Sequence, residues 1–111
     1  MLNLTKQKAD HALKILKQKL IERFAERVEL YLFGSVARGD FHRESDIDVL
    51  VLINEGLTRE VEKEILNIAF NIELDEDVVF GLLIESKNDW QTPLFQAMPI
   101  HKVIDEEGIL I

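Results

Sequence analysis

The sequence predicts a small α/β (α+β) domain in which a mixed sheet of three to four strands is covered by helices. Two observations support this fold class. Segments with the three-to-four-residue apolar spacing of amphipathic helices alternate with short segments rich in β-branched and aromatic residues. Their order is helix, strand, turn, strand, helix, strand, followed by a small C-terminal elaboration. At 111 residues, without an interdomain linker, the chain is expected to form one domain over residues 1–111.

The first helix is expected over residues 5–26, where apolar residues recur at steps of three and four. They form one face, made of Ala9, Leu13, Leu16, Leu20 and Phe24. The first strand is expected over Val28–Phe33, which is short and ends at a glycine. Residues 34–43 are predicted to be mostly turn, with room for one helical turn.

The second strand is expected over Asp46–Ile53, whose nearly unbroken apolar run is typical of an inner strand covered on both faces. After a loop, Thr58 is predicted to cap a second helix. The core face of this helix is made of Val61, Ile65, Ile68 and Ile72. The helix should end before Asp77, and Val78–Ile84 should follow as a third strand, interrupted at Gly81.

The C-terminal part is predicted to add a short helix and an edge strand. Asn88 or Asp89 is expected to cap a helix that contains Trp90 and Phe95, and Pro93 suits its first turn. We expect both aromatic side chains to pack in the core or an interface, because no basic residues are interleaved with them as in a base-stacking platform. Pro99 prevents simple continuation of this helix, and residues 109–111 would form the edge strand.

Charge and composition exclude several classes of function. The net charge of -8, from 13 basic and 21 acidic residues, argues against a domain that binds extended nucleic acid by neutralising phosphates. The absence of cysteine excludes disulfides and thiolate sites. No apolar run approaches the length of a membrane span, so we expect no membrane association and a cytoplasmic location.

Gly34 and Ser35 follow directly after the first predicted strand. Glycine permits a tight bend and a close approach, while exposed backbone N–H groups and the serine hydroxyl can bind phosphate oxygens. Arg38, four residues after Gly34, is placed to neutralise phosphate charge. These residues therefore form a candidate nucleotide-binding segment, although a strand that ends at glycine is also common in ordinary turns.

Asp46 and Asp48 stand at the start of the second predicted strand. The two-residue period of a strand places both carboxylates on one face. Two adjacent carboxylates repel each other unless a cation lies between them, and Mg²⁺ usually takes one or two carboxylates together with water and substrate phosphates. Antiparallel pairing of the first two strands would bring this pair beside Gly34 and Ser35. The sequence thus predicts a site for a metal-bound nucleotide at one end of the sheet.

This arrangement resembles the signature of the DNA polymerase β-like nucleotidyltransferases, in which a Gly-Ser pair precedes Asp-x-Asp. The segments GSVARGD and SDIDVLV are most similar to the minimal nucleotidyltransferases, a group often encoded beside HEPN-domain toxins. The C-terminal pattern of Trp90, Pro93, Ile104, Glu107 and Gly108 is also similar, so the resemblance extends along the whole chain. It implies the nucleotidyltransferase fold.

The resemblance further implies two Mg²⁺ ions and a third carboxylate that helps to hold the catalytic ion. Asp77 is favoured for this role over Glu85, because parallel second and third strands would start at the same end of the sheet. Glu85 lies eight residues further on, roughly 26 Å at about 3.3 Å per residue. Asp75 is an alternative if the strand starts earlier. The resulting metal ligands and catalytic residues are Asp46, Asp48 and Asp77.

The expected activity is Mg²⁺-dependent transfer of a nucleoside monophosphate, AMP from ATP, to an acceptor with release of pyrophosphate. The resemblance suggests a partner protein as acceptor, specifically a HEPN toxin. One alternative is a catalytically idle antitoxin or scaffold that only binds its partner. Another is modification of a small molecule, although antibiotic nucleotidyltransferases generally have a further domain. Acidity and size disfavour templated polymerisation.

Overall fold

The protein is built on a four-stranded mixed sheet with the strand order β3-β2-β1-β4. We describe residues 2–111 of a computed structural model. The strands are β1 (Val28–Phe33), β2 (Ile47–Ile53), β3 (Phe80–Ser86) and β4 (Ile109–Leu110). β1 pairs antiparallel with β2 and β4, whereas β2 and β3 are parallel. The predicted mixed sheet of three to four strands is therefore confirmed, with β2 as an inner strand.

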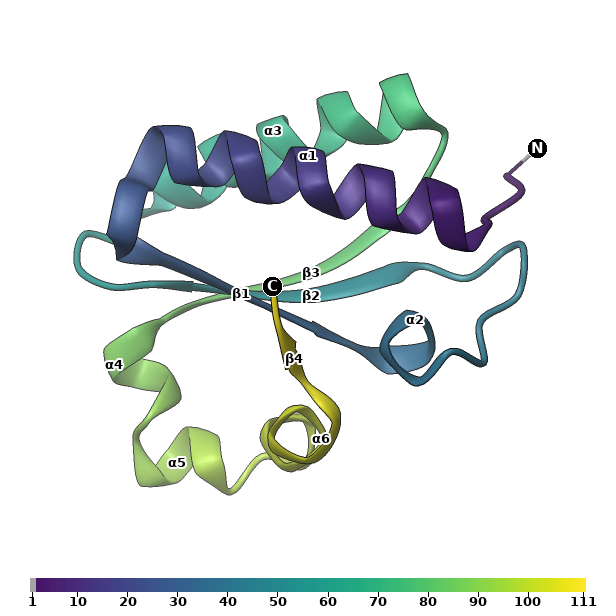
Figure 1. The fold of residues 1–111 in the computed structure, drawn as a ribbon. Helices are drawn as coiled ribbons and strands as arrows, with labels where there is room; N and C mark the ends of the chain where they lie inside the picture. The colour runs from purple at the N-terminus through teal and green to yellow at the C-terminus, as the bar shows by residue number, and fades with distance from the viewer. Residues whose placement is uncertain (1) are drawn as a thin grey trace.

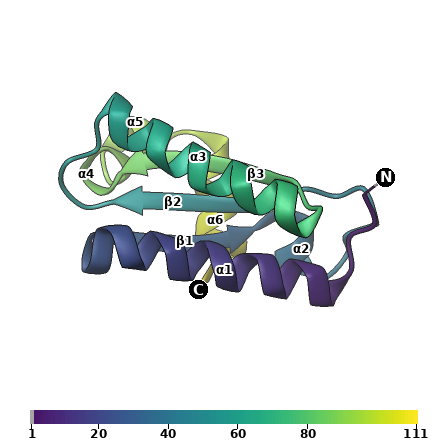
Figure 2. The ribbon, with the colours of Figure 1, turned by 90° about the horizontal axis from the view of Figure 1, so that it is seen from above.

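Two long helices cover one face of the sheet. They are α1 (Lys6–Phe24), which is followed by the 3-10 turn Ala25–Arg27, and α3 (Arg59–Glu76). The two helices lie side by side and run roughly along the strands (Figure 2). Thr58 caps α3 as expected, since its side chain accepts from Val61 N–H. Thr5, expected as the first residue of the first helix, is its N-cap, and its side chain accepts from Lys8 N–H. The predicted core face of α1 is buried in full.

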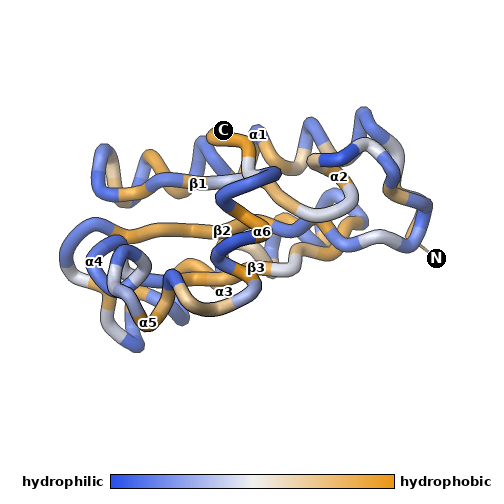
Figure 3. The backbone as a smooth tube through the Cα atoms, turned by 90° about the horizontal axis from the view of Figure 1, so that it is seen from below, coloured by the Kyte–Doolittle hydropathy of each residue, from blue (hydrophilic) through white to orange (hydrophobic). Residues whose placement is uncertain are grey.

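The other face of the sheet carries the shorter helices (Figure 1). They are α2 (Gly34–Arg38), α4 (Lys87–Trp90), α5 (Pro93–Gln96) and α6 (Pro99–Glu107). The sheet is thus sandwiched between two layers, each with its own apolar core. β2 contributes to both cores and, apart from Asp48, consists of hydrophobic residues (Figure 3). Within the described residues, no helix is both long and apolar enough to cross a membrane.

β3 and the C-terminal helices differ from the sequence prediction, and β3 ends at Ser86 rather than Ile84. β3 begins at Phe80 rather than Val78, because Asp77 ends α3 in the left-handed conformation with φ 58° and Val78 and Val79 connect the two elements. The expected single helix around Trp90 is two helices. Their caps are Ser86 and Thr92, not Asn88 or Asp89. Each cap hydroxyl accepts a backbone N–H and starts a new turn, which separates Trp90 from Phe95.

Candidate active site

Asp48 lies between two glycines from neighbouring strands. The register of β1 and β2 pairs Phe33 with Asp48, so Gly34 follows at the end of β1, and the register of β2 and β3 pairs Asp48 with Gly81. A Cβ atom at Gly34 would overlap Oδ2 of Asp48, and one at Gly81 would overlap Oδ1. Gly34 also adopts a φ of 76°, which favours glycine. Both positions therefore need glycine if this carboxylate is to keep its place.

Asp46 lies on the same side of the sheet as Asp48. It precedes β2 by one residue, and its Cβ is 3.9 Å from the position that a Cβ on Gly81 would occupy. Asp46 is exposed, whereas Asp48 is half-buried. The proximity of Gly34 to Asp48, expected from the short connection between the strands, is therefore found in the structure.

The electrostatics of the pair favour a cation. Burial raises the pKa of Asp48, and the negative charge of Asp46 raises it further. Arg38 acts in the opposite direction, while Glu107 adds a smaller increase in the pKa. The charged form of Asp48 is thus disfavoured until positive charge arrives, which is the behaviour expected of a carboxylate pair that shares a bound cation.

Ser35 and Arg38 belong to α2, the helical turn that follows Gly34. The carbonyl oxygen of Ser35 accepts from the N–H groups of Gly39 and Asp40 and closes this turn. Arg38 Nε donates to Asp40 Oδ2 at 3.2 Å. Hydrogen bonds to Asp40 and then Glu107 raise the pKa of the Arg38 guanidinium. α2 therefore brings a permanent positive charge to the end of the sheet where Gly34 and Asp48 meet.

Glu107, the last residue of α6, reaches the same place and was not predicted as a site residue. Its Oε1 accepts from Gly34 N at 3.0 Å and from Arg38 Nη1 at 3.1 Å, and Oε2 is 3.2 Å from the same Nη1. The residue is separated from Gly34 by 73 positions in the sequence, so no local spacing could indicate the contact. The sequence marked Glu107 only as part of a C-terminal resemblance.

The structure does not bring Asp77 to the aspartate pair. Asp77 caps α3, and its Oδ2 lies 3.4 Å from the ammonium group of Lys8 on α1, the helix that covers the other face of the sheet. Asp75 is on the exposed surface of α3. Among residues 2–111, no three His, Asp or Glu side chains form a group that could hold a metal ion. The β3 residue beside Asp48 is Gly81, so that strand supplies no third carboxylate there.

Glu85 is also remote from the pair, as expected from the sequence. It follows Gly81 by four residues on β3 and is paired with Leu52 at the far end of β2. Burial raises the pKa of Glu85, and the nearby carboxylates of Asp89 and Glu62 raise it further. This group belongs to the opposite end of the sheet from the candidate site.

The donor set of Asp46 and Asp48 fits a hard divalent cation. Both groups are oxygen ligands on one face, and the pKa of Asp48 is raised first by burial and then by the negative charge of Asp46. Mg²⁺ is commonly bound by one or two carboxylates and completes its octahedron with water and substrate phosphates. Two protein carboxylates are therefore sufficient for an ion that arrives with a nucleotide.

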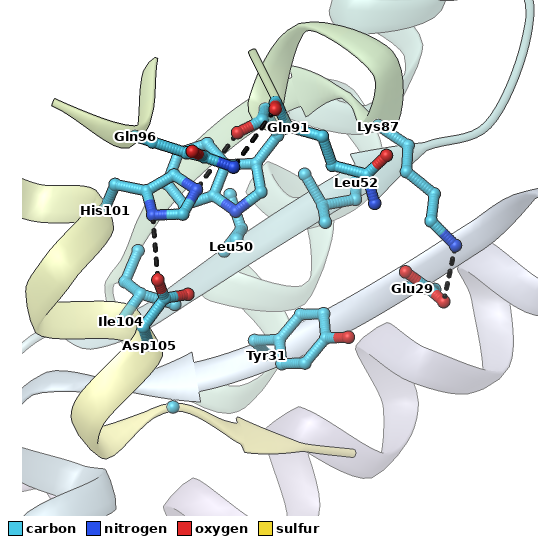
Figure 4. Close-up of a pocket in the computed structure, with 12 residues that line it drawn as sticks. Glu29, Tyr31, Leu50, Leu52, Lys87, Gln91, Gln96, His101, Ile104 and Asp105 are labelled. Carbon is cyan, nitrogen blue, oxygen red and sulfur yellow. Dashed lines mark hydrogen bonds and ion pairs between the residues drawn. The ribbon is translucent and has the colours of Figure 1, made fainter. Parts of the chain in front are cut away.

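A separate cavity of about 490 Å³ lies between the sheet and α4, α5 and α6 (Figure 4). Tyr31, Leu50 and Leu52 line it on the sheet side. The buried Trp90 ring stacks on His101 at 4.2 Å, which confirms packing as its role. His101 is fixed by Trp90 O and Asp105, and Lys87 pairs with Glu29 across the cavity mouth in Figure 4.

Comparison with known proteins identifies a family and two structures with the same fold. A family model described as a nucleotidyltransferase domain matches residues 13–102. A protein of Methanocaldococcus jannaschii, provisionally named a protein adenylyltransferase, is 42% identical over 73 residues, which make up 66% of this chain and 67% of the relative. A toxin-antitoxin crystallised with AMP-PNP has a TM-score of 0.56 at 24% identity and covers 96% of this chain and 72% of its own. A mutant of the toxin-antitoxin MntA-HpeT has a TM-score of 0.54 at 21% identity, with coverages of 96% and 71%.

Proposed function

The chain belongs to the nucleotidyltransferase domain family, and on that premise we propose that it transfers AMP from ATP to a side chain of a partner protein, with Mg²⁺ as cofactor. The observation that carries this proposal is the position of the Asp48 carboxylate between Gly34 and Gly81, with Asp46 on the same side. This geometry supports a site at one end of the sheet in which carboxylates would hold a cation and backbone N–H groups would bind phosphate oxygens.

Each residue has a distinct part in the proposed reaction. Asp46 and Asp48 would hold Mg²⁺, which when bound would neutralise triphosphate charge and act as a Lewis acid. Gly34 N–H and the Ser35 hydroxyl would donate to phosphate oxygens, and Arg38 would neutralise part of their charge. A hydroxyl oxygen of the acceptor would form a bond to the α-phosphorus while the bond from this phosphorus to the departing pyrophosphate breaks, and the hydroxyl proton would pass to water. Positioning and charge neutralisation are the main contributions that such transfers require.

A protein acceptor is supported by two kinds of observation. The relative from M. jannaschii is named for adenylylation of proteins, and both neighbouring structures are toxin-antitoxins, one of them with AMP-PNP. The similarity of GSVARGD and SDIDVLV to minimal nucleotidyltransferases points to a HEPN-domain toxin as the partner. We therefore propose a HEPN toxin as acceptor, modified by this domain.

The test is transfer of label from α-³²P-ATP to a co-purified HEPN partner in the presence of Mg²⁺. We expect labelled partner and released pyrophosphate, both at least about 100-fold reduced by Asp46→Asn or Asp48→Asn, because each removes charge used in transition-state stabilisation. Asp77→Asn serves as the matched control and should leave transfer unchanged. No transfer from any nucleotide by the wild type, or undiminished transfer by both site variants, would contradict the proposal.

A second candidate function is a binding-only antitoxin. It is favoured by one observation, that Gly81 rather than a carboxylate stands beside Asp48 on β3. In this case the domain would bind and inhibit its partner without transferring a nucleotide. Growth of cells that co-express the toxin distinguishes the two candidates. The double variant Asp46→Asn/Asp48→Asn should lose protection if the domain is an enzyme and keep it if the domain only binds.

A further inference from the structure

The carboxylate of Glu107 occupies the donors that the site offers to a phosphate. Oε1 accepts from Gly34 N at 3.0 Å and from Arg38 Nη1 at 3.1 Å, while Oε2 lies 3.2 Å from that same nitrogen. A carboxylate and a phosphate oxygen are both acceptor-only anionic groups that bind to backbone N–H and guanidinium donors. A bound nucleotide would therefore compete with Glu107 for the same hydrogen bonds.

The fold places this carboxylate firmly. Glu107 is the last residue of α6, and Gly108 directly after it donates its N–H to Ile104 O at 2.7 Å. The next two residues form β4, which pairs with β1 at Tyr31 and Leu32, the second of which is two residues before Gly34. The end of a helix and the start of a strand thus both hold Glu107 against α2. Its side chain is 22% exposed, so the contact is partly shielded from water.

Glu107 also adds negative charge to a site that already holds two aspartates. Its carboxylate contributes to the raised pKa of Asp48. Asp40 binds the other side of the Arg38 guanidinium, so this one cation faces several acids. A triphosphate that arrives without a cation would meet net repulsion, and it would also have to displace Glu107 from Gly34.

We propose that Glu107 is an internal substitute for a phosphate group and sets the affinity of the nucleotide site. In the nucleotide-free protein its carboxylate occupies Gly34 N–H and Arg38, and a metal-bound triphosphate displaces it. Ligands that make few other contacts, such as inorganic phosphate, do not displace the carboxylate. This inference rests on the proposed function, because it assumes that Gly34 and Arg38 bind the triphosphate.

The test compares binding of Mg²⁺ and a non-hydrolysable ATP analogue by calorimetry in the wild type, Glu107→Gln and Glu106→Gln. The neighbouring Glu106 is exposed, so the two substitutions change the net charge equally but only one removes the carboxylate from the site. We expect Glu107→Gln to lower the Kd of the nucleotide analogue about 3- to 10-fold. This change is smaller than the one that loss of a full charge-assisted hydrogen bond would cause, because the side chain is partly hydrated and glutamine keeps one acceptor oxygen. Glu106→Gln should change Kd less than about twofold.

The outcomes separate this inference from the proposed function. Unchanged or weaker binding in Glu107→Gln, with normal binding in the other two proteins, would overturn the role of Glu107 alone. Absence of nucleotide binding in all three proteins would overturn the proposed function as well.

A measurement on the wild type tests the inference even if Glu107→Gln does not fold. NMR spectra recorded during titration with pyrophosphate and Mg²⁺ report on the Gly34 amide and on the side-chain carboxyl carbon of Glu107. Both signals should shift with the same midpoint, while the Glu106 carboxyl should not. A shift of Gly34 without a shift of Glu107, or no shift of either, would show that pyrophosphate does not displace the carboxylate.

Discussion

At the scale of single residues, the site depends on where side chains are absent as much as on where they are present. Gly34 and Gly81 approach the two oxygens of the Asp48 carboxylate from β1 and β3. Gly34 was recognised in the sequence because it follows a strand and precedes serine. Gly81 was predicted only as an interruption of the third strand. Its pairing with Asp48 depends on the register of β2 and β3, which the sequence does not give.

The variant Gly81→Ala should reduce activity more than stability. The backbone of β3 at Gly81 does not have the positive φ that favours glycine. An added methyl group would overlap only Oδ1 at the end of the Asp48 side chain, while Cβ of Asp46 at 3.9 Å is in ordinary van der Waals contact. Rotation of the Asp48 side chain relieves the overlap and displaces the carboxylate. We expect nucleotide transfer to fall by at least about tenfold, as for other displaced catalytic groups, and the free energy of unfolding to change by less than about 1 kcal/mol.

A double variant provides the control for this effect. In the Asp48→Asn background, addition of Gly81→Ala should cause little further loss of transfer, because the group that it displaces is already neutral. If instead the double variant loses transfer by the product of the two single-variant factors, Gly81 acts on something other than Asp48. Thermal unfolding of all three variants verifies that the folded state is retained.

The raised pKa of Asp48 predicts a pH-dependent effect on stability. The folded state favours the protonated carboxyl of Asp48, because its pKa is higher there than in the unfolded chain. Its contribution to the free energy of unfolding is therefore fully present below the ordinary pKa of about 3.9 and is lost as the pH rises through the pKa of the folded state. In EDTA, Asp48→Asn should therefore have a higher Tm than the wild type at pH 7, and the difference should shrink near pH 3.5. Asp77→Asn is the matched surface control, and a Tm difference that does not depend on pH would contradict the assignment.

At the scale of secondary-structure elements, periodic and capped segments were predicted well. The two long helices begin within a residue of their expected starts, at Lys6 and Arg59, since each combines an apolar face with a threonine cap. Of the two caps, only Thr58 was predicted. β1 and β2 were also located within a residue of their bounds. For these elements, local chemistry and the tertiary fold favour the same conformation.

Short elements were predicted less accurately because tertiary contacts define their ends. Phe80 N–H donates to the side chain of Glu73 at 2.8 Å, which joins the last turn of α3 to the start of β3. Ser86 and Thr92 each start a short helix, although Asn88 and Asp89 are equally good caps by composition. The choice among neighbouring caps depends on how Trp90 is buried, which the local sequence does not reveal.

The same distinction explains the site residues. Gly34, Asp46 and Asp48 lie near one another because a short connection joins two antiparallel strands, and this could be inferred from spacing. Glu107 arrives from the far end of the chain through packing of α6 against α2. Asp77 was expected beside Asp46 from strand direction alone, whereas in the structure it is the left-handed C-cap of α3 and its carboxylate lies beside Lys8.

At the scale of the whole molecule, the two faces of the sheet serve different purposes. One face is covered by α1 and α3 and holds the larger core, whereas the other carries the aspartate pair, α2 and the C-terminal helices (Figure 1). α6 contributes both to the cavity and to the candidate active site on this second face. Its residues His101 and Ile104 line the cavity, and Glu107 contacts Gly34. With a net charge of -8, the surface favours a ligand that brings its own cations.

The most direct test of the account is a crystal structure with Mg²⁺ and a non-hydrolysable ATP analogue. We expect an ion held by Asp46 and Asp48, a phosphate oxygen within hydrogen-bonding distance of Gly34 N, and the Glu107 carboxylate turned away from that nitrogen. A nucleotide bound in the cavity beside Tyr31 and Trp90, with the aspartate pair free of metal, would contradict the central claim that this end of the sheet holds the triphosphate.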